Sequence, residues 1–311
     1  MDTAKTDVNR IRIGMVGLGS IAQKAYLPVL CQETHWTFAG VFSPDQQKMQ
    51  TLCQQYRLSG FSSLETLARK CDAVMVHSST ASHYDVISAL LRLGVHVYVD
   101  KPLAETLSQA EALLALAQRQ GKTLMVGFNR RFAPGYLALK SSLQMPMSIR
   151  MEKHRADSVG PQLARFTLLD DYLHVVDTAL WLADEGVVLQ GGVIRNNPAG
   201  QLVFAEHLFA SPTCQIVTSM HRCAGSQRES VQMITEGTTY HVDNLNDCWQ
   251  ERDGVVIRQP APSWQSILEQ RGFVGAVHHF VDALDRGMEP HTSGEQAILA
   301  QRMVETLFTS C

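Results

Sequence analysis

Gly17-Leu18-Gly19-Ser20-Ile21-Ala22 follows an apolar, β-branched run at residues 11–16 and precedes a stretch with helical spacing of apolar residues. A strand, this loop and a helix together form the dinucleotide-binding fingerprint. Gly17 permits a tight turn, Gly19 lets the backbone approach a pyrophosphate, and Ala22 is small enough for close packing of the helix on the strand. The helix start at Ser20 and Ile21 offers unpaired N–H groups to an anion. A strand-to-helix turn without a ligand has the same local pattern, so the surrounding chain must decide.

The residues after this loop alternate between short apolar runs and helical patterns. We predict strands at residues 11–16, 37–42, 73–77, 96–99 and 123–126, and helices at 84–93 and 108–120. This order is typical of βαβ units in a doubly wound parallel sheet. It favours the phosphate-binding interpretation of residues 17–22.

The rhythm changes after Gly127. Alternating stretches at 149–154, 203–209, 215–221 and 230–236 predict a largely antiparallel sheet, and helical patterns occur at 168–183, 275–285 and 294–308. The sequence therefore predicts an α/β protein with an amino-terminal Rossmann domain and a carboxy-terminal α/β domain built on a large, mostly antiparallel open sheet. We place the NAD(P)-binding domain at residues 8–128 and a substrate-binding and oligomerisation domain at 129–311.

Composition limits the classes of partner that we expect this chain to bind. The 311 residues carry a formal net charge of −3 and contain no long Lys/Arg block, so we expect a small-molecule substrate and no nucleic acid. Apolar stretches are far shorter than a bilayer span and residues 1–10 are polar, so we expect no membrane association and a cytoplasmic location. Seven cysteines without a C-x-x-C pair indicate reduced thiols, most of them in the core.

The end of the second predicted strand bears on the choice of cofactor. An acidic residue that binds the ribose is expected there, but the chain has Ser43-Pro44-Asp45. Ser43 is interpreted either as a helix N-cap or as a group facing a 2′-phosphate. We therefore predict NAD(P), with NADP slightly favoured.

Several motifs resemble the Gfo/Idh/MocA oxidoreductases and occur in that family's order. They are Asp100-Lys101-Pro102, with Asp100 in place of the usual Glu, the run from Gly127 to Phe132, and Asp170-x-x-x-His174-x-x-Asp177. Residues 77–101 and 166–182 are similar to the family's MviM/YceM-type members. The resemblance implies action on sugars, inositols or related polyols and assembly as a homodimer or homotetramer. It also implies a cofactor site that includes Ser78, His83, Asp100, Lys101, Asn129 and Arg131.

Lys101, Asp170 and His174 form the candidate catalytic set. Hydride transfer from an alcohol carbon needs a base for the hydroxyl proton and a group that stabilises charge on oxygen. We assign His174 to the proton, Asp170 to its orientation or to a substrate hydroxyl, and Lys101 to the oxygen. We expect these three residues and His154 to contact substrate. Asp170, His174 and Asp177 share one face of a predicted helix.

Other interpretations of these residues stay open. Lys101 could be a solvated loop lysine held by Asp100, and His174 a structural histidine. Arg131 could form a structural salt bridge. Basic residues at 153–155 could favour an anionic substrate or belong to an exposed strand. His154 with the Asp/His helix could hold a metal, although no metal-ligand spacing supports this and we predict none. A non-catalytic NAD(P)-binding sensor or partner-binding protein is the alternative function, but it would not need a proton-transfer set.

Overall fold

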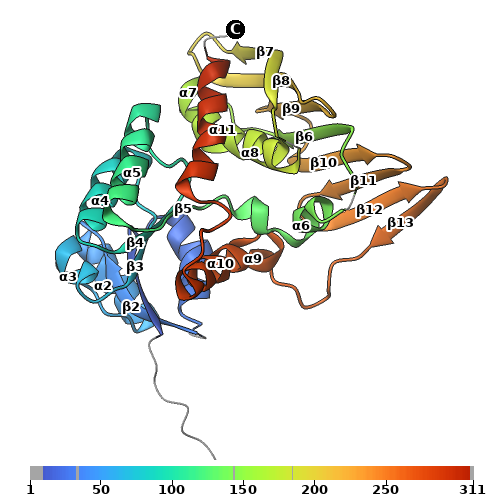
Figure 1. Ribbon diagram of the computed structural model, residues 1–311. Helices are drawn as coiled ribbons and strands as arrows, with labels where there is room; N and C mark the ends of the chain where they lie inside the picture. The colour runs from blue at the N-terminus through green and yellow to red at the C-terminus, as the bar shows by residue number, and fades with distance from the viewer. Residues whose placement is uncertain (1–9, 33–34, 143, 184, 309–311) are drawn as a thin grey trace, which may run out of the picture. The chain divides into compact units, whose positions relative to one another are not determined.

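A computed structural model describes residues 10–32, 35–142, 144–183 and 185–308 (Figure 1). Residues 8 and 9, most of the polar start and Cys311, which the sequence analysis included, lie outside this part. The chain forms two compact units. The first comprises the described residues through Gly127 together with Ala276–Gln296, and the second comprises Phe128–Gly275 with the described residues from Ala297 onward.

The first unit is built on a five-stranded parallel sheet in the order β2-β1-β3-β4-β5. Its strands are β1 (Ile11–Val16), β2 (Trp36–Phe42), β3 (Ala73–Val76), β4 (His96–Val99) and β5 (Leu124–Val126). The chain order reverses beside β1, as in a Rossmann fold, so ligands are expected at the carboxyl ends of these strands. The predicted strands and the doubly wound class are confirmed, with boundaries that differ by at most one residue.

Helices connect these strands and close the unit. They are η1 (Ala22–Tyr26, a π-helical turn), α1 (Leu27–Leu30), α2 (Gln46–Tyr56), α3 (Leu64–Ala68), α4 (Thr80–Arg92), α5 (Leu107–Gln120) and α10 (Phe273–Arg286). α5 shows how the sequence sets an element's ends. Thr106 and Gln109 form a capping box at its start, and Gly121 ends it in the left-handed conformation.

Residues 276–296 belong to the first unit, whereas the sequence analysis divided the chain once, after residue 128. The reason is that α10 buries Val277, Phe280 and Val281 in this unit. The Phe280 ring meets Tyr98 edge-on, with centroids 5.5 Å apart. The segment after α10 then hydrogen-bonds to the sheet, since Val126 N–H donates to the carbonyl of Thr292 at 2.8 Å.

The second unit is built on an eight-stranded sheet in the order β13-β12-β11-β10-β6-β9-β8-β7. All neighbours are antiparallel except β6 and β9, which confirms the predicted sheet type. The strands are β6 (Ser148–His154), β7 (Val188–Asn196), β8 (Leu202–Ala210), β9 (Gln215–His221), β10 (Arg228–Thr235), β11 (Thr238–Asp243), β12 (Asp247–Arg252) and β13 (Val255–Gln259). The other elements are η2 (Asn129–Phe132), α6 (Pro134–Lys140), α7 (Ala164–Thr167), η3 (Leu168–Tyr172), α8 (Leu173–Leu182), α9 (Ile267–Gln270) and α11 (Gly294–Leu307).

Burial on β6 distinguishes the two faces of this sheet. Ile149, Met151 and Lys153 are buried, whereas the alternate residues are more accessible. α8 packs against β6 and β9. It is preceded by the π-helical turn η3, so the predicted helix at 168–183 has an irregular first turn.

Membrane-spanning helices and metal-ion clusters are both absent from the described residues. Every helix there is too short or too polar to cross a bilayer. These residues contain no group of three or more His, Cys, Asp or Glu side chains that could hold a metal ion. None of the six described cysteines forms a disulfide with another described residue, but only Cys71 and Cys214 are buried. The expectation that most lie in the core is therefore wrong for the described cysteines.

Candidate active-site residues and relatives

Gly17 makes the turn that follows β1. Its φ of +88° lies in the left-handed region, which glycine adopts without a steric penalty. A Cβ at this position would collide with the backbone nitrogen of Ser78 and would lie 2.7 Å from the His77 carbonyl oxygen. Gly17 N–H donates to the Phe42 carbonyl at 3.0 Å. Both the conformation and the packing against the end of β3 therefore require glycine here.

Gly19 has different surroundings. A Cβ there would meet only the His77 carbonyl oxygen, at an ordinary contact distance of 3.8 Å. The protein's own packing therefore does not require glycine at this position. The exposed Ser20 and Ile21 follow at the start of the helix, and Ala22 is buried. An open space beside Gly19 at a helix start suits the pyrophosphate of a dinucleotide, so these residues fit NAD(P).

Ser43 lies at the end of β2, beside the same edge of the sheet. It is buried, and it is not the helix cap that the sequence suggested as one interpretation. Asp45 caps α2 by accepting a hydrogen bond from Lys48 N–H at 3.0 Å. The helix begins two residues later than that interpretation required.

The ends of β3 and β4 carry the other candidates of the first unit. The His83 ring links them, because Nδ1 lies 2.9 Å from the Pro102 carbonyl oxygen and Nε2 lies 3.2 Å from that of Ser78. Burial lowers the pKa of His83. Asp100 accepts a hydrogen bond from the Lys101 backbone N–H at 2.9 Å, which shapes the loop that carries the Lys101 side chain.

His77, which the sequence analysis did not select, lies beneath this edge. It is buried and stacks on Tyr26 with ring centroids 3.8 Å apart. Neither ring nitrogen has a hydrogen-bond partner among the described residues, and burial lowers the pKa of His77 to about 3. The ring is therefore neutral and serves as packing under the loop. No sequence motif distinguished it from the apolar run of β3 that precedes it.

Asn129 and Arg131 lie on η2, in the second unit. Arg131 forms a bidentate ion pair with Asp177 of α8, with N–O distances of 2.6 and 3.1 Å. Both side chains are buried, and burial raises the pKa of Asp177 despite the opposing charge of Arg131. Asn129 Nδ2 donates to the Arg271 carbonyl at 2.7 Å. The Arg131 salt bridge, which the sequence analysis gave as one interpretation, is therefore present in the structure.

His174 and Asp170 lie on neighbouring elements of the same irregular helix. His174 is 7% exposed on α8, and the Phe128 ring lies edge-on to it with centroids 6.4 Å apart. Asp170 lies in η3 and is half-buried. This region carries two of the three residues proposed from sequence for catalysis. The third, Lys101, belongs to the first unit.

Asp171, next to Asp170, is the centre of an ion-pair cluster that the sequence analysis missed. Its carboxylate lies 2.5 Å from Lys153 Nζ and 3.4 Å from the Arg155 guanidinium, and it also binds Arg222. Burial alone would raise the pKa of Asp171, but Lys153 and Arg155 hold it below its ordinary value. The pairing depends on which strands lie beneath η3, so spacing along the chain could not reveal it.

Glu229 forms the second centre of this cluster. Arg130 binds it in bidentate fashion at 2.6 and 2.7 Å, and Lys153 Nζ lies 3.9 Å from it. Burial would raise the pKa of Glu229, but Arg130 and Lys153 lower it to about 2. We call the cluster of Arg130, Lys153, Arg155, Asp171, Arg222 and Glu229 the basic cluster.

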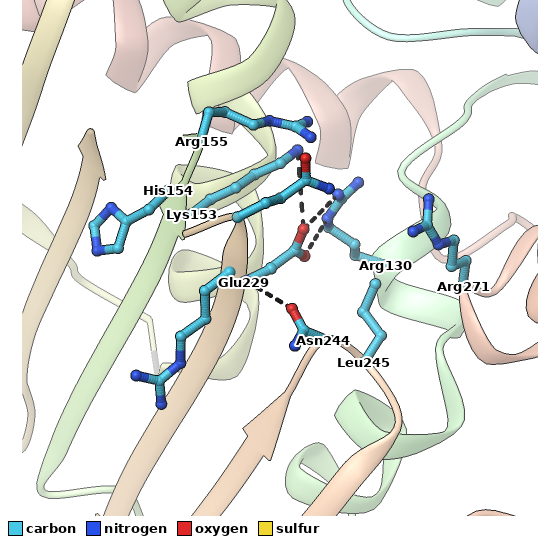
Figure 2. Close-up of a pocket in the computed structure, with 10 residues that line it drawn as sticks. Arg130, Lys153, His154, Arg155, Glu229, Asn244, Leu245 and Arg271 are labelled. Carbon is cyan, nitrogen blue, oxygen red and sulfur yellow. Dashed lines mark hydrogen bonds and ion pairs between the residues drawn. The ribbon is translucent and has the colours of Figure 1, made fainter. Parts of the chain in front are cut away.

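His154 lies on the opposite face of β6 from Lys153. Its Nδ1 accepts a hydrogen bond from His221 N–H at 3.1 Å, and its Nε2 lies 3.7 Å from the Glu152 carboxylate. Figure 2 shows the ring pointing away from Lys153, Arg155 and Glu229. His154 lines the same pocket as Lys153 and Arg155, but Asp170 and His174 do not line it, so the metal alternative that paired His154 with the Asp/His helix is unsupported.

Comparisons with known proteins agree with this fold. Residues 11–128 match the family model GFO_IDH_MocA, "Oxidoreductase family, NAD-binding Rossmann fold", and residues 134–253 match "YceM-like, C-terminal domain". "Putative oxidoreductase YceM" of Salmonella typhimurium is 56% identical over 96% of this chain and 97% of that protein. The D-apiose dehydrogenase of Paraburkholderia graminis is 28% identical over 78% of this chain and 72% of its own length.

A solved structure extends the comparison to three dimensions. The dehydrogenase MviM from Clostridium difficile superposes with a TM-score of 0.95 and 43% identity, covering 97% of this chain and all of that one. The match includes both units, and the relative YceM spans the same length. The chain therefore belongs to the Gfo/Idh/MocA family of oxidoreductases, with an NAD(P)-binding Rossmann domain at its amino-terminal end.

Proposed function

We propose that this oxidoreductase transfers a hydride between a nicotinamide cofactor and a sugar, polyol or related hydroxy or keto compound. The observation that carries the proposal is the loop at Gly17 and Gly19, which is packed tightly at the first glycine and open at the second. The D-apiose dehydrogenase among its relatives supports a sugar-like substrate.

NADP is the favoured cofactor. The buried Ser43, rather than a carboxylate, follows β2, so the position lacks the acidic group that binds the ribose hydroxyls of NAD and repels a 2′-phosphate. Fluorescence titration with NADPH and NADH tests this preference. Tighter binding of NADPH is the expected result, and tighter binding of NADH would contradict it.

The residues of this chain supply the proton chemistry, while the nicotinamide, when bound, supplies or accepts the hydride. His174 exchanges the proton of the substrate hydroxyl, and the Asp170 carboxylate orients that ring or binds a second hydroxyl. Lys101 donates a hydrogen bond to the substrate oxygen and stabilises its developing charge. Asp100 supports Lys101 by fixing the backbone N–H of the same residue.

The experiment is a steady-state assay that follows NADP reduction with a panel of sugars and polyols, and NADPH oxidation with their keto forms. Once a substrate is found, His174→Ala should lower kcat at least a hundredfold, because general acid–base catalysis contributes roughly 10² to 10⁴. His291→Ala is the matched control, since His291 is exposed in the first unit. Near-normal turnover of His174→Ala would refute the assignment.

We also propose that the enzyme is cytoplasmic and assembles as a dimer or tetramer through the open sheet. The six described cysteines, none of them in a disulfide, suit a reducing compartment. The sheet exposes several large apolar side chains, namely Val188, Leu208, Ile234, Val255, Val256 and Ile257. Light scattering after size-exclusion chromatography tests the assembly, and a monomer at micromolar concentration would contradict it.

A further inference from the structure

A pocket in the second unit is lined mainly by basic side chains. Its wall includes Arg130, Lys153, Arg155 and Arg271, together with Glu229 and Asn244. Figure 2 shows the first three and Glu229 converging on one side, with Arg271 facing them from the other side of the pocket. These residues come from η2, the end of β6, β10, the turn after β11 and the residue after α9, so the fold brings together five separate segments of the chain.

The pocket and the basic cluster together carry more positive than negative charge. Glu229 and Asp171 are the two carboxylates bound to the basic cluster, whereas Arg130, Lys153, Arg155, Arg222 and Arg271 contribute five cations. Arg228 also lines the pocket but pairs with Asp243 at 2.9 Å. Three positive charges therefore remain without a matching carboxylate in this set.

Lys153 is buried within the basic cluster. Its side chain is only 6% exposed, and Asp171 and Glu229 both lie near its ammonium group. Burial and the charge of Arg130 nevertheless lower the pKa of Lys153 to about 8. Burial is the larger of these two causes, and Asp171 and Glu229 only partly oppose it, so a bound anion would favour the protonated lysine.

Arg271 and Arg155 are the cations best placed to bind a ligand. Arg271 is exposed, and its guanidinium forms no ion pair with any residue in the described ranges, while its carbonyl is anchored by Asn129 at 2.7 Å. Arg155 is 28% exposed, and its contacts with the Asp171 carboxylate are long, at 3.4 Å. Guanidinium groups bind phosphate in bidentate fashion.

We propose that this pocket binds a phosphate monoester and that the enzyme's substrate is a phosphorylated sugar or polyol. The dianionic phosphate matches the excess of positive charge better than a single carboxylate does. The assignment of the pocket as a substrate subsite rests on the proposed function. The pocket's capacity to bind phosphate does not, because every residue involved belongs to the second unit.

Isothermal titration of the full chain with inorganic phosphate at pH 7 and constant ionic strength tests the pocket. Arg271→Ala and Arg155→Ala should each weaken phosphate binding about tenfold, and Lys153→Met by at least as much. Arg195→Ala is the matched control, because Arg195 is an exposed arginine of β7 outside the pocket. It should leave phosphate binding unchanged. Arg271 is exposed and unpaired, so its variant keeps the test informative even if Lys153→Met fails to fold.

Three results would overturn the proposal: no saturable binding of phosphate, equal weakening by Arg195→Ala, or binding of acetate as tight as that of phosphate. The last would assign the pocket to carboxylates. NADPH titration of the same variants distinguishes this proposal from the cofactor assignment, since NADPH affinity should not change. If phosphate binds as expected but only unphosphorylated sugars or polyols exchange a hydride with the cofactor, the pocket and the proposed function stand and the subsite assignment fails. If no substrate of either kind turns over, the pocket stands and the proposed function fails.

Discussion

The different surroundings of Gly17 and Gly19 predict different effects of substitution by alanine. Gly17→Ala should lower the free energy of unfolding, whereas Gly19→Ala should lower the affinity for NADPH. In Gly17→Ala the new methyl group would collide with the Ser78 nitrogen and approach the His77 carbonyl oxygen to 2.7 Å, at a φ of +88°. The left-handed conformation costs roughly 1–2 kcal/mol, and the backbone shift needed to relieve the collision adds a similar amount. We expect the free energy of unfolding to fall by about 3 kcal/mol.

In Gly19→Ala the methyl group would have no closer protein neighbour than the His77 carbonyl oxygen at 3.8 Å. The free energy of unfolding should change by less than about 0.5 kcal/mol. NADPH affinity should nevertheless fall at least about tenfold, or 1.4 kcal/mol, because the methyl group takes the space that we assign to the pyrophosphate.

Urea denaturation and NADPH fluorescence titration of the two variants measure these effects separately. Gly225→Ala is the control, because a Cβ at Gly225 would meet nothing within 4 Å. It should change neither quantity. If Gly19→Ala binds NADPH as tightly as the parent protein, the loop does not hold the pyrophosphate and the cofactor assignment is wrong.

Three further predictions concern the basic cluster. Glu229→Gln should lower the free energy of unfolding by about 3 kcal/mol in urea denaturation, because it leaves Arg130 buried without its carboxylate; an unchanged midpoint would contradict this. The pKa of Glu229 is lowered to about 2 from 4.5, so its contribution to stability is present above pH 4.5 and is lost as the pH falls toward 2. Thermal unfolding between pH 5 and 3 should show this loss, and Glu229→Gln should weaken the dependence. The advantage of the parent protein over Lys153→Met in phosphate affinity should shrink as the pH rises through about 8, because Lys153 then loses its proton while Asp171, Glu229 and the surrounding arginines keep their charges. Calorimetry of both proteins at pH 7 and 9 measures it, since the change in the charge of phosphate itself affects both alike, and an undiminished advantage would contradict the role of Lys153.

The first unit was largely predictable from sequence because its signals are local. β1, the turn at Gly17 and the small Ala22 are contiguous, and burial on both faces makes each parallel strand a short apolar run. The second sheet was less accessible to such reasoning. β7 contains Gly191-Gly192 and a bulge, and β13 is exposed along its whole length, so neither has the alternation that marks a half-buried strand.

The candidate site, too, was predictable only where its signals are local in the sequence. Lys101, Asp170 and His174 were selected from residue types and spacing, but their roles remain proposals. Asp171 could not be distinguished from Asp170 by sequence, since its partners come from β6 and from the segment after β9. His154 shows the converse, because strand alternation alone separates it from Lys153, and only the position of α8 tells which face is covered.

The discontinuous first unit has a consequence for synthesis on the ribosome. When Gly127 leaves the exit tunnel, the parallel sheet still lacks Phe280 against Tyr98 and the Thr292 carbonyl beside Val126. Both arrive only after the entire eight-stranded sheet has been translated. The nascent Rossmann sheet must therefore wait for more than a hundred residues before its last apolar surface is covered, and a fragment ending at Gly127 should need a chaperone or a solubilising partner to remain in solution.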